Sequence, residues 1–147
     1  MKCKILVCVV VIQLIISSLV AQTQADGIVG IWLTGGKEPA NIQIYKSGDK
    51  YFGKIIWLKA PEENGKPKLD KENPDKSKRN QQIIGLVILK DFKFNRRNEW
   101  EDGKIYDPEN GKTYSCNLTL KDRNILDVRG YIGLSLFGRT ETWTRTK

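Results

Sequence analysis

The chain has 147 residues, which suits a single domain. It carries 25 basic against 17 acidic residues, a net charge of +8, with no histidine and only three cysteines. The lack of histidine excludes Ser-His-Asp and Cys-His catalysis and His-ligated zinc or haem. Three cysteines exclude a disulfide-dense scaffold and any four-cysteine metal or cluster site within one chain. We therefore expect no metal site and no cofactor.

The N-terminal segment has the pattern of an export signal. Two lysines precede an apolar run over residues 5–16 that only one glutamine interrupts. This run is close to the ~7–15 residues of a signal-peptide core and shorter than the ~18 or more of a membrane-spanning helix. Small side chains favour cleavage after Ala25, which divides the chain into a signal peptide, 1–25, and an exported domain, 26–147. Cleavage after Ala21 and an uncleaved anchor are the alternatives.

Processing after Ala25 would leave 122 residues, with 23 basic against 17 acidic side chains and a net charge of +6. It would also leave Cys116 as the sole cysteine, and a lone thiol cannot form an internal disulfide. Stability must then come from a hydrophobic core, for which this length suffices. Cys116 alternates in phase with apolar neighbours, so we interpret it as a small buried side chain. We expect a periplasmic or secreted protein with no transmembrane span.

Alternation with a period of two dominates the rest of the chain. Residues 41–46 and 114–121 alternate polar and apolar side chains, as strands with one face on a core do. Asp102-Gly103 and Asn110-Gly111 supply tight-turn residues between such runs. We predict strands near 28–34, 40–46, 50–59, 84–94, 99–106, 112–121, 125–131 and 138–146, with a helical turn at 131–137.

About eight short antiparallel strands in one domain predict an all-β fold, a single antiparallel up-and-down β-barrel. Closure removes the exposed strand edges that would otherwise pair with other chains. A barrel of this size either fills with side chains or holds one small ligand. The pattern leaves open which side of the strand at 50–59 faces inward: Tyr51, Ile55 and Trp57, or Phe52, Ile56 and Leu58.

Residues 60–80 form an unusually long and highly charged connection in which Leu69 is the sole large apolar residue. Loops longer than ~12–15 residues are usually functional or disordered. We interpret this one as a mobile surface flap, and Asp70 and Asp75 within it as solvated charges. Asp107 opens a Pro-Glu-Asn-Gly turn, where an aspartate commonly caps its own backbone, so we favour turn capping over catalysis.

Two positions resemble the closing signature of lipocalin-like (calycin) barrels. Gly30 and Trp32 form a Gly-x-Trp motif on the first predicted strand, and Arg139 lies on the last. The resemblance implies that the arginine packs over the indole, where its donors also satisfy backbone carbonyls. Arg145 is a competing partner on the same face.

A second resemblance rests on segments spread over nearly all of the processed chain. They are Gly30–Trp32, Gly53–Leu58, Gly65–Asp75, Gly85–Leu89, Ile105–Tyr114, Arg129–Gly133 and Phe137–Trp143. In combination they resemble a bacterial secreted family designated domain of unknown function 2147. This resemblance implies an exported or periplasmic β-barrel and brings no catalytic residue.

The candidate ligand-binding residues are Tyr45, Trp57, Tyr106, Tyr114 and Arg129. The aromatic rings offer apolar area with a polar tip. Arg129 would meet an anionic head group if its strand turned that face toward a polar cavity. The alternatives are that the aromatic rings fill the barrel and that Arg129 is an exposed surface residue. No spacing in the sequence requires a catalytic residue.

The sequence therefore predicts an exported, non-enzymatic barrel that binds a small hydrophobic or amphipathic ligand. One alternative is a cell-envelope protein that binds anionic polymers or lipid phosphates, because the positive charge favours acidic partners. Another is a small-molecule enzyme that works with carboxylates and tyrosines. Nucleic acid, the usual partner of a basic barrel with surface aromatics, is not expected for an exported protein.

Overall fold

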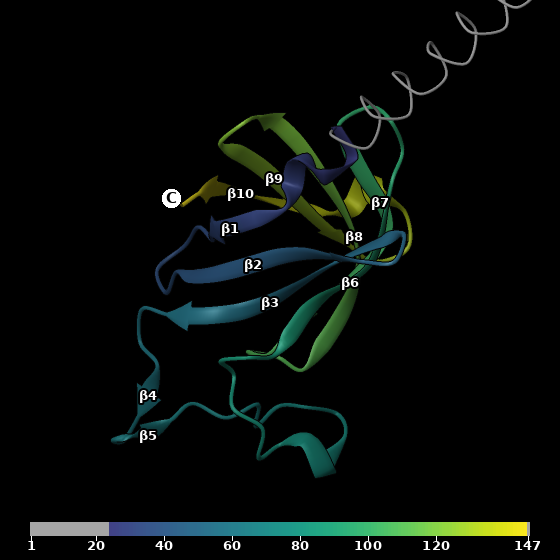
Figure 1. Ribbon diagram of the computed structural model, residues 1–147. Helices are drawn as coiled ribbons and strands as arrows, with labels where there is room; N and C mark the ends of the chain where they lie inside the picture. The colour runs from purple at the N-terminus through teal and green to yellow at the C-terminus, as the bar shows by residue number, and fades with distance from the viewer. Residues whose placement is uncertain (1–23, 147) are drawn as a thin grey trace, which may run out of the picture.

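The computed structural model describes residues 24–146, which form a closed antiparallel barrel (Figure 1). Around the barrel the strand order is β1-β10-β9-β8-β7-β6-β3-β2, so neighbours in sequence are neighbours in space. The strands are β1 (Gly30–Leu33), β2 (Ala40–Ser47), β3 (Lys50–Leu58), β6 (Val87–Phe94), β7 (Glu99–Asp107), β8 (Lys112–Asp122), β9 (Ile125–Tyr131) and β10 (Arg139–Arg145). The predicted eight-stranded, up-and-down all-β barrel is confirmed.

The remaining elements are short. A two-stranded sheet, β4 (Glu62–Glu63) with β5 (Lys66–Pro67), lies in the long connection between β3 and β6. Three 3₁₀ turns complete the described chain: η1 (Asp26–Ile28), η2 (Lys76–Lys78) and η3 (Ser135–Phe137). Within residues 24–146, no helix has the length and apolar character needed to cross a bilayer. Apart from Gln24 and Ala25, the predicted signal segment lies outside the described residues.

The inward face of β3 carries Tyr51 and Ile55, which are both buried. Trp57 belongs to the same alternating set, yet its side chain is 44% exposed. The cause is a shift of the β2–β3 register, which pairs Ile42 with Ile55 and then Asn41 with Trp57. A bulge of this kind adds one residue to one strand and turns the following side chain to the other face. The sequence pattern cannot show such a shift.

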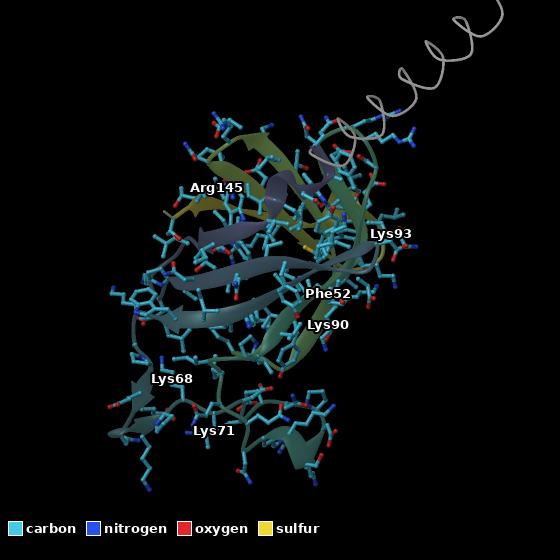
Figure 2. All side chains as sticks on the ribbon, in the orientation of Figure 1. Phe52, Lys68, Lys71, Lys90, Lys93 and Arg145 are labelled. Atoms are coloured by element: carbon cyan, nitrogen blue, oxygen red, sulfur yellow. The ribbon has the colours of Figure 1, made fainter. Side chains whose placement is uncertain are left out.

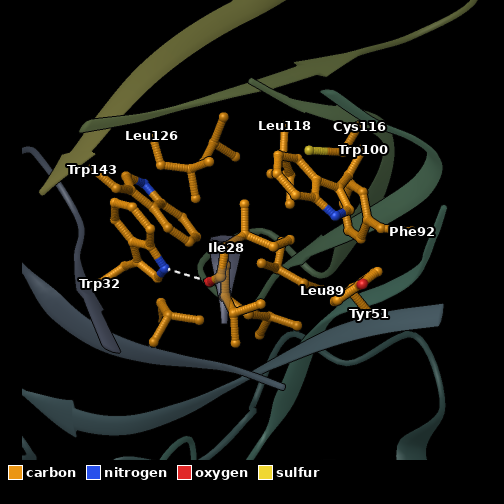
Figure 3. Packing of buried hydrophobic residues seen from close by; sticks show 14 of the residues in the cluster. Ile28, Trp32, Tyr51, Leu89, Phe92, Trp100, Cys116, Leu118, Leu126 and Trp143 are labelled. Atoms are coloured by element: carbon orange, nitrogen blue, oxygen red, sulfur yellow. Dashed lines mark hydrogen bonds between the residues drawn. The ribbon is translucent and has the colours of Figure 1, made fainter. Parts of the chain in front are cut away.

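Three indole rings are buried inside the barrel: Figure 3 shows Trp32 beside Trp143, and Trp100 across the core from them, on the far side of Ile28. Trp32 and Trp100 are fully buried and Trp143 is 1% exposed. Each indole N–H has a partner: Trp32 donates to the Ile28 carbonyl at 2.8 Å, Trp100 to the Ala25 carbonyl at 3.1 Å and Trp143 to a Glu141 carboxylate oxygen at 2.8 Å. A buried N–H without a hydrogen-bond partner is costly, so these bonds both satisfy the indole N–H groups and hold the rings in their orientations. The part of the interior around these rings is therefore filled by side chains.

The guanidinium that covers Trp32 belongs to Arg145. Its central carbon lies 4.2 Å from the ring centroid, and Arg145 is paired directly opposite Trp32 in the β1–β10 register. It also donates to the carbonyls of Arg123 at 2.6 Å, Val29 at 2.9 Å and Gly27 at 2.6 Å. These bonds tie η1 and the first strand to the end of the last strand, which closes the barrel.

The prediction that Arg139 performs this role was wrong. Arg139 pairs with Gly130 at the other end of β10 and is exposed. Gly30 is confirmed as part of the closure, because a Cβ there would lie 2.4 Å from an Arg145 guanidinium nitrogen and the φ angle is +146°. Only glycine leaves the arginine room to reach over the strand.

Candidate functional site

The connection from β3 to β6 is folded against the barrel. A β-bridge joins Leu69 to Gln82, and the Ile83 amide donates to the Lys68 carbonyl at 3.0 Å. The Arg79 side chain also donates to a backbone carbonyl of the connection, that of Asn73, at 2.8 Å. Ile83 itself joins the buried core. The prediction of a loose surface flap is therefore corrected: hydrogen bonds and one apolar anchor hold the connection.

Asp70 lies at the centre of this arrangement and is fully buried. One carboxylate oxygen accepts the Tyr106 hydroxyl at 2.7 Å, and the other accepts the Asn73 amide at 2.6 Å. Burial, and then the Asp70 carboxylate, raise the pKa of Tyr106 above its usual range. The interpretation of Asp70 as a solvated charge was wrong, because its partner comes from β7, which is distant in sequence.

Two other aspartates behave as caps. Asp75 accepts the Ser77 amide at 3.0 Å at the start of η2, and the Ser77 bonds lower its pKa. Asp107 accepts the Glu109 amide at 2.9 Å and the Asn110 side-chain amide at 2.8 Å. The predicted capping role of Asp107 is therefore confirmed.

The turn between β7 and β8 lies directly against the connection. Gly111 has a φ angle of +70°, and a Cβ at this position would lie 1.9 Å from the Glu72 carbonyl oxygen. The backbone of the connection thus rests directly on a glycine in the left-handed region.

A groove of about 340 Å³ lies between the connection and the outer surface of the barrel. Pro74, Leu86 and Val87 give it apolar surface, while three lysines supply positive charge. The lining residues are Asn73, Pro74, Lys78, Gln81, Leu86, Val87, Ile88, Lys90, Lys104, Tyr106 and Thr113. In Figure 2, Lys90 lies on β6 close to where the connection meets the barrel. We call this feature the lysine groove.

Two lysines of the groove face each other across neighbouring strands. Lys90 pairs with Lys104 in the β6–β7 register, so their side chains leave the same face of the sheet. Like charges in directly opposed positions repel. The Lys104 ammonium donates to the Ser115 hydroxyl at 2.9 Å, a neutral partner. None of the salt bridges among residues 24–146 involves Lys90 or Lys104. An anion in the groove would relieve this repulsion.

The third lysine of the groove is already paired. Lys78 lies 3.4 Å from Asp75, and both side chains are about half exposed. A pair of this exposure contributes little to stability and exchanges readily with other partners.

The predicted aromatic candidates do not converge on one pocket. Of the four, Tyr106 lines the lysine groove. Tyr114 is half-buried and pairs with Ile105, and its hydroxyl oxygen accepts the Asn110 amide at 3.1 Å. Tyr45 stacks on Phe52 with ring centroids 5.9 Å apart. Trp57 is partly exposed at the bulge, as described above. Alternation identifies a face of a strand, but it does not say which strands meet.

Arg129 contacts the loop between β9 and β10. Its side chain donates to the Ser135 carbonyl at 2.9 and 2.7 Å, to the Leu136 carbonyl at 3.3 Å and to the Thr140 hydroxyl at 2.8 Å. Arg129 therefore does not lie inside a polar cavity, as one hypothesis predicted. It lies on the outer surface and holds the β9–β10 loop through hydrogen bonds.

Two features missed by the sequence analysis make the groove. Lys90 and Lys104 carry no local motif, and only the strand register brings them together.

Among the described residues, no group of three or more cysteine, aspartate and glutamate side chains is placed to hold a metal ion. Burial raises the pKa of the Cys116 thiol to about 12, so this side chain is packed and unreactive, as its alternation predicted.

The closed eight-stranded barrel with an arginine over the first-strand tryptophan defines a lipocalin-like fold. Among solved structures, the chain is similar to protein HP1028 from the human pathogen Helicobacter pylori, described as a member of the lipocalin family. The two share 25% sequence identity with a TM-score of 0.73, over 82% of this chain and 83% of that one.

The chain belongs to the bacterial family DUF2147, described as uncharacterized protein conserved in bacteria, whose sequence profile matches residues 30–145. No curated protein matches the chain.

Proposed function

We propose that this protein is an exported lipocalin-like barrel that binds a small amphipathic molecule with an anionic group, and that the lysine groove is the binding site. The observation that carries the proposal is the direct pairing of Lys90 with Lys104, with no acidic side chain in ion-pair contact with either among the described residues. The apolar surface of Leu86 and Val87 lies in the same groove. The export signal in the sequence supports a role outside the cytoplasm.

The two kinds of lining act on different parts of such a ligand. Burial of hydrocarbon against Leu86 and Val87 contributes roughly 25 cal/mol for each Å² removed from water. The ammonium groups orient the anionic end and give specificity more than affinity. The bonds from Tyr106 and Asn73 to buried Asp70 hold one wall of the groove in place before any ligand arrives. A site organised in advance loses less entropy on binding.

Several observations favour the outer groove over the barrel interior and favour binding over catalysis. Buried side chains, three indole rings among them, already pack together inside the barrel. Three aspartates next to lining residues are engaged: Asp107 in its own turn, Asp70 with Tyr106 and Asn73, and Asp75 with Ser77 and Lys78. The relative described as a lipocalin supports the broader assignment to small-molecule binding.

The test compares two fluorescent probes of similar size on the full chain. 1-Anilinonaphthalene-8-sulfonate carries a sulfonate, and N-phenyl-1-naphthylamine is uncharged. The double variant Lys90→Gln/Lys104→Gln should weaken binding of the sulfonate about tenfold, equivalent to about 1.4 kcal/mol, and change the neutral probe little. Lys121→Gln, an exposed lysine on β8, is the matched control. Equal weakening of both probes, or no difference between the double variant and the control, would contradict the assignment.

A second candidate is binding to anionic envelope polymers, which the net charge supports. The charged connection also bears exposed lysines, among them Lys66, Lys71 and Lys76. A polymer that spans these lysines would bind with a strong dependence on salt, whereas a small ligand in the groove would saturate at one equivalent. Titration at two salt concentrations with a polyanion, such as polyglutamate, separates the two candidates.

A further inference from the structure

The loop between β9 and β10 exposes four large apolar side chains. Ile132 is 72% exposed, Leu134 70%, Leu136 78% and Phe137 77%. We call residues 132–137 the apolar loop. Together these side chains expose roughly 600 Å² of apolar surface, at the upper end of the largest patch on a typical monomer. The sequence predicted a helical turn here, and η3 confirms it, but the turn presents its apolar side chains to the outside.

Three backbone carbonyl groups of the apolar loop accept hydrogen bonds from other groups of the protein. The Ser135 carbonyl accepts two bonds from Arg129 at 2.9 and 2.7 Å, and the Leu136 carbonyl accepts one at 3.3 Å. The Leu134 carbonyl accepts the Phe137 amide at 3.1 Å. Three successive carbonyl oxygens therefore have donors that do not depend on water.

This pattern matches the requirements of a hydrocarbon environment. A backbone carbonyl without a donor is costly in lipid, whereas exposed apolar side chains are favourable there. In water the apolar side chains of this loop would remain hydrated. The hydrogen bonds to its carbonyls would then add little stability, because water could donate to the same oxygens. The arrangement is thus better suited to the edge of a bilayer than to solvent.

Positive charge lies at the base of the same loop. Arg129 makes its bonds to neutral oxygens, and Arg139 is exposed at the first position of β10. Neither arginine takes part in a salt bridge among the described residues. Basic side chains next to a membrane surface attract anionic lipid phosphates.

We propose that the apolar loop is a membrane-docking surface, which inserts Leu136 and Phe137 into the interfacial layer of a bilayer that contains anionic lipid. This surface is separate from the lysine groove, and the proposal does not depend on the groove. A second copy of the chain is the less suitable occupant, because a stable interface buries about 800 Å² on each partner and the loop offers less.

The experiment places a probe on the loop of the full chain. The variant Phe137→Trp adds one indole to the loop. Subtracting the fluorescence spectrum of the wild-type chain from that of the variant gives the emission of this added indole. Ile84→Trp, at a site that is 41% exposed and outside the loop, is the matched control. Both variants are mixed with vesicles of phosphatidylcholine containing about one-third phosphatidylglycerol, with and without brominated acyl chains.

We expect the added fluorescence at position 137 to shift to shorter wavelength and to be quenched at least about twofold by brominated lipid, with little change at position 84. Replacing Arg139 with Gln should weaken this quenching. Absence of quenching at position 137, or equal quenching at both positions, overturns the proposal. A dimer that forms without lipid and is lost in Leu136→Ser/Phe137→Ser, with no quenching by vesicles, would instead assign the loop to a second copy.

Discussion

Replacement of Arg145 with Met tests the closure of the barrel. The variant keeps much of the unbranched apolar stem and removes the guanidinium, which lies 4.2 Å above Trp32 and donates to three backbone carbonyls. Each bond contributes about 0.5–1.5 kcal/mol net, and the cation–π contact about 0.5–1 kcal/mol. The carbonyls regain part of this from water, because the arginine is only half-buried. These contributions sum to about 2–5.5 kcal/mol, and because water replaces part of them we expect a loss of about 3 kcal/mol, in the lower half of that range.

Urea unfolding followed by tryptophan fluorescence measures this loss, and a thermal melt should show a fall in Tm of about 10 °C for a chain of this size. Arg145→Lys keeps the charge but loses the planar fork, and should recover only part of the stability. Arg139→Met is the matched control, because this exposed arginine lies at the opposite end of the same strand. Its effect should stay within about 0.5 kcal/mol. Equal losses for Arg145→Met and Arg139→Met would refute the assignment of the closing arginine.

Four further outcomes are expected. Gly111→Ala should release the connection between β3 and β6 and speed its cleavage by trypsin, because the new Cβ would lie 1.9 Å from the Glu72 carbonyl; Gly48→Ala, with a φ of +64° and nothing within 4 Å, controls for backbone strain. The free energy of unfolding should fall as the pH rises above 10. Burial, and then hydrogen bonds to Asp26 and Asp70, raise the folded-state pKa values of Tyr51 and Tyr106 above the ordinary value of 10.0. The unfolded chain therefore releases these protons at lower pH than the folded chain, which favours unfolding as the pH rises. Urea titrations at several pH values, repeated with Phe at both positions, should show a flatter decline for the variant. In a chain with Cys3 and Cys8 changed to Ser, Cys116 should resist Ellman's reagent at neutral pH until the protein unfolds, since burial raises its pKa to about 12; rapid reaction of the native protein would contradict this. Finally, if the chain is exported and cleaved, the bond from the Trp100 indole N–H to the Ala25 carbonyl at 3.1 Å favours the alternative cleavage after Ala21 over the cleavage after Ala25 that the small side chains indicate, because only the former keeps Ala25; the intact mass of the processed protein distinguishes a start at Gln22 from one at Asp26.

The apolar character of the proposed membrane-docking surface can be recognised from the sequence, but its orientation cannot. The run from Tyr131 to Phe137 is too apolar for an ordinary exposed loop, and this is evident from the residues alone. The sequence could not show whether the run packs onto the barrel or points away from it. In the structure the turn points away from the core, and Arg129 donates to its carbonyls in that position.

Local patterns determined the class of fold. Alternation with a period of two depends on neighbouring residues alone, as do the Asn-Gly and Asp-Gly turns, so the strand number and the barrel followed from the sequence. The cap at Asp107 and the burial of Cys116 followed for the same reason. The Gly-x-Trp motif indicated the closed end correctly, while the identity of its arginine depended on pairing between the two ends of the chain.

The tertiary structure decided everything that depends on register between distant segments. It placed Arg145 opposite Trp32, turned Trp57 outward at a bulge, set Lys90 against Lys104 and buried Asp70 beneath Tyr106. A shift of one residue in any of these pairings would exchange the inner and outer faces of a strand without changing its alternation. The amino-acid sequence therefore predicts that a barrel forms, whereas the pairing of strands far apart in the chain determines which side chains meet on its surface.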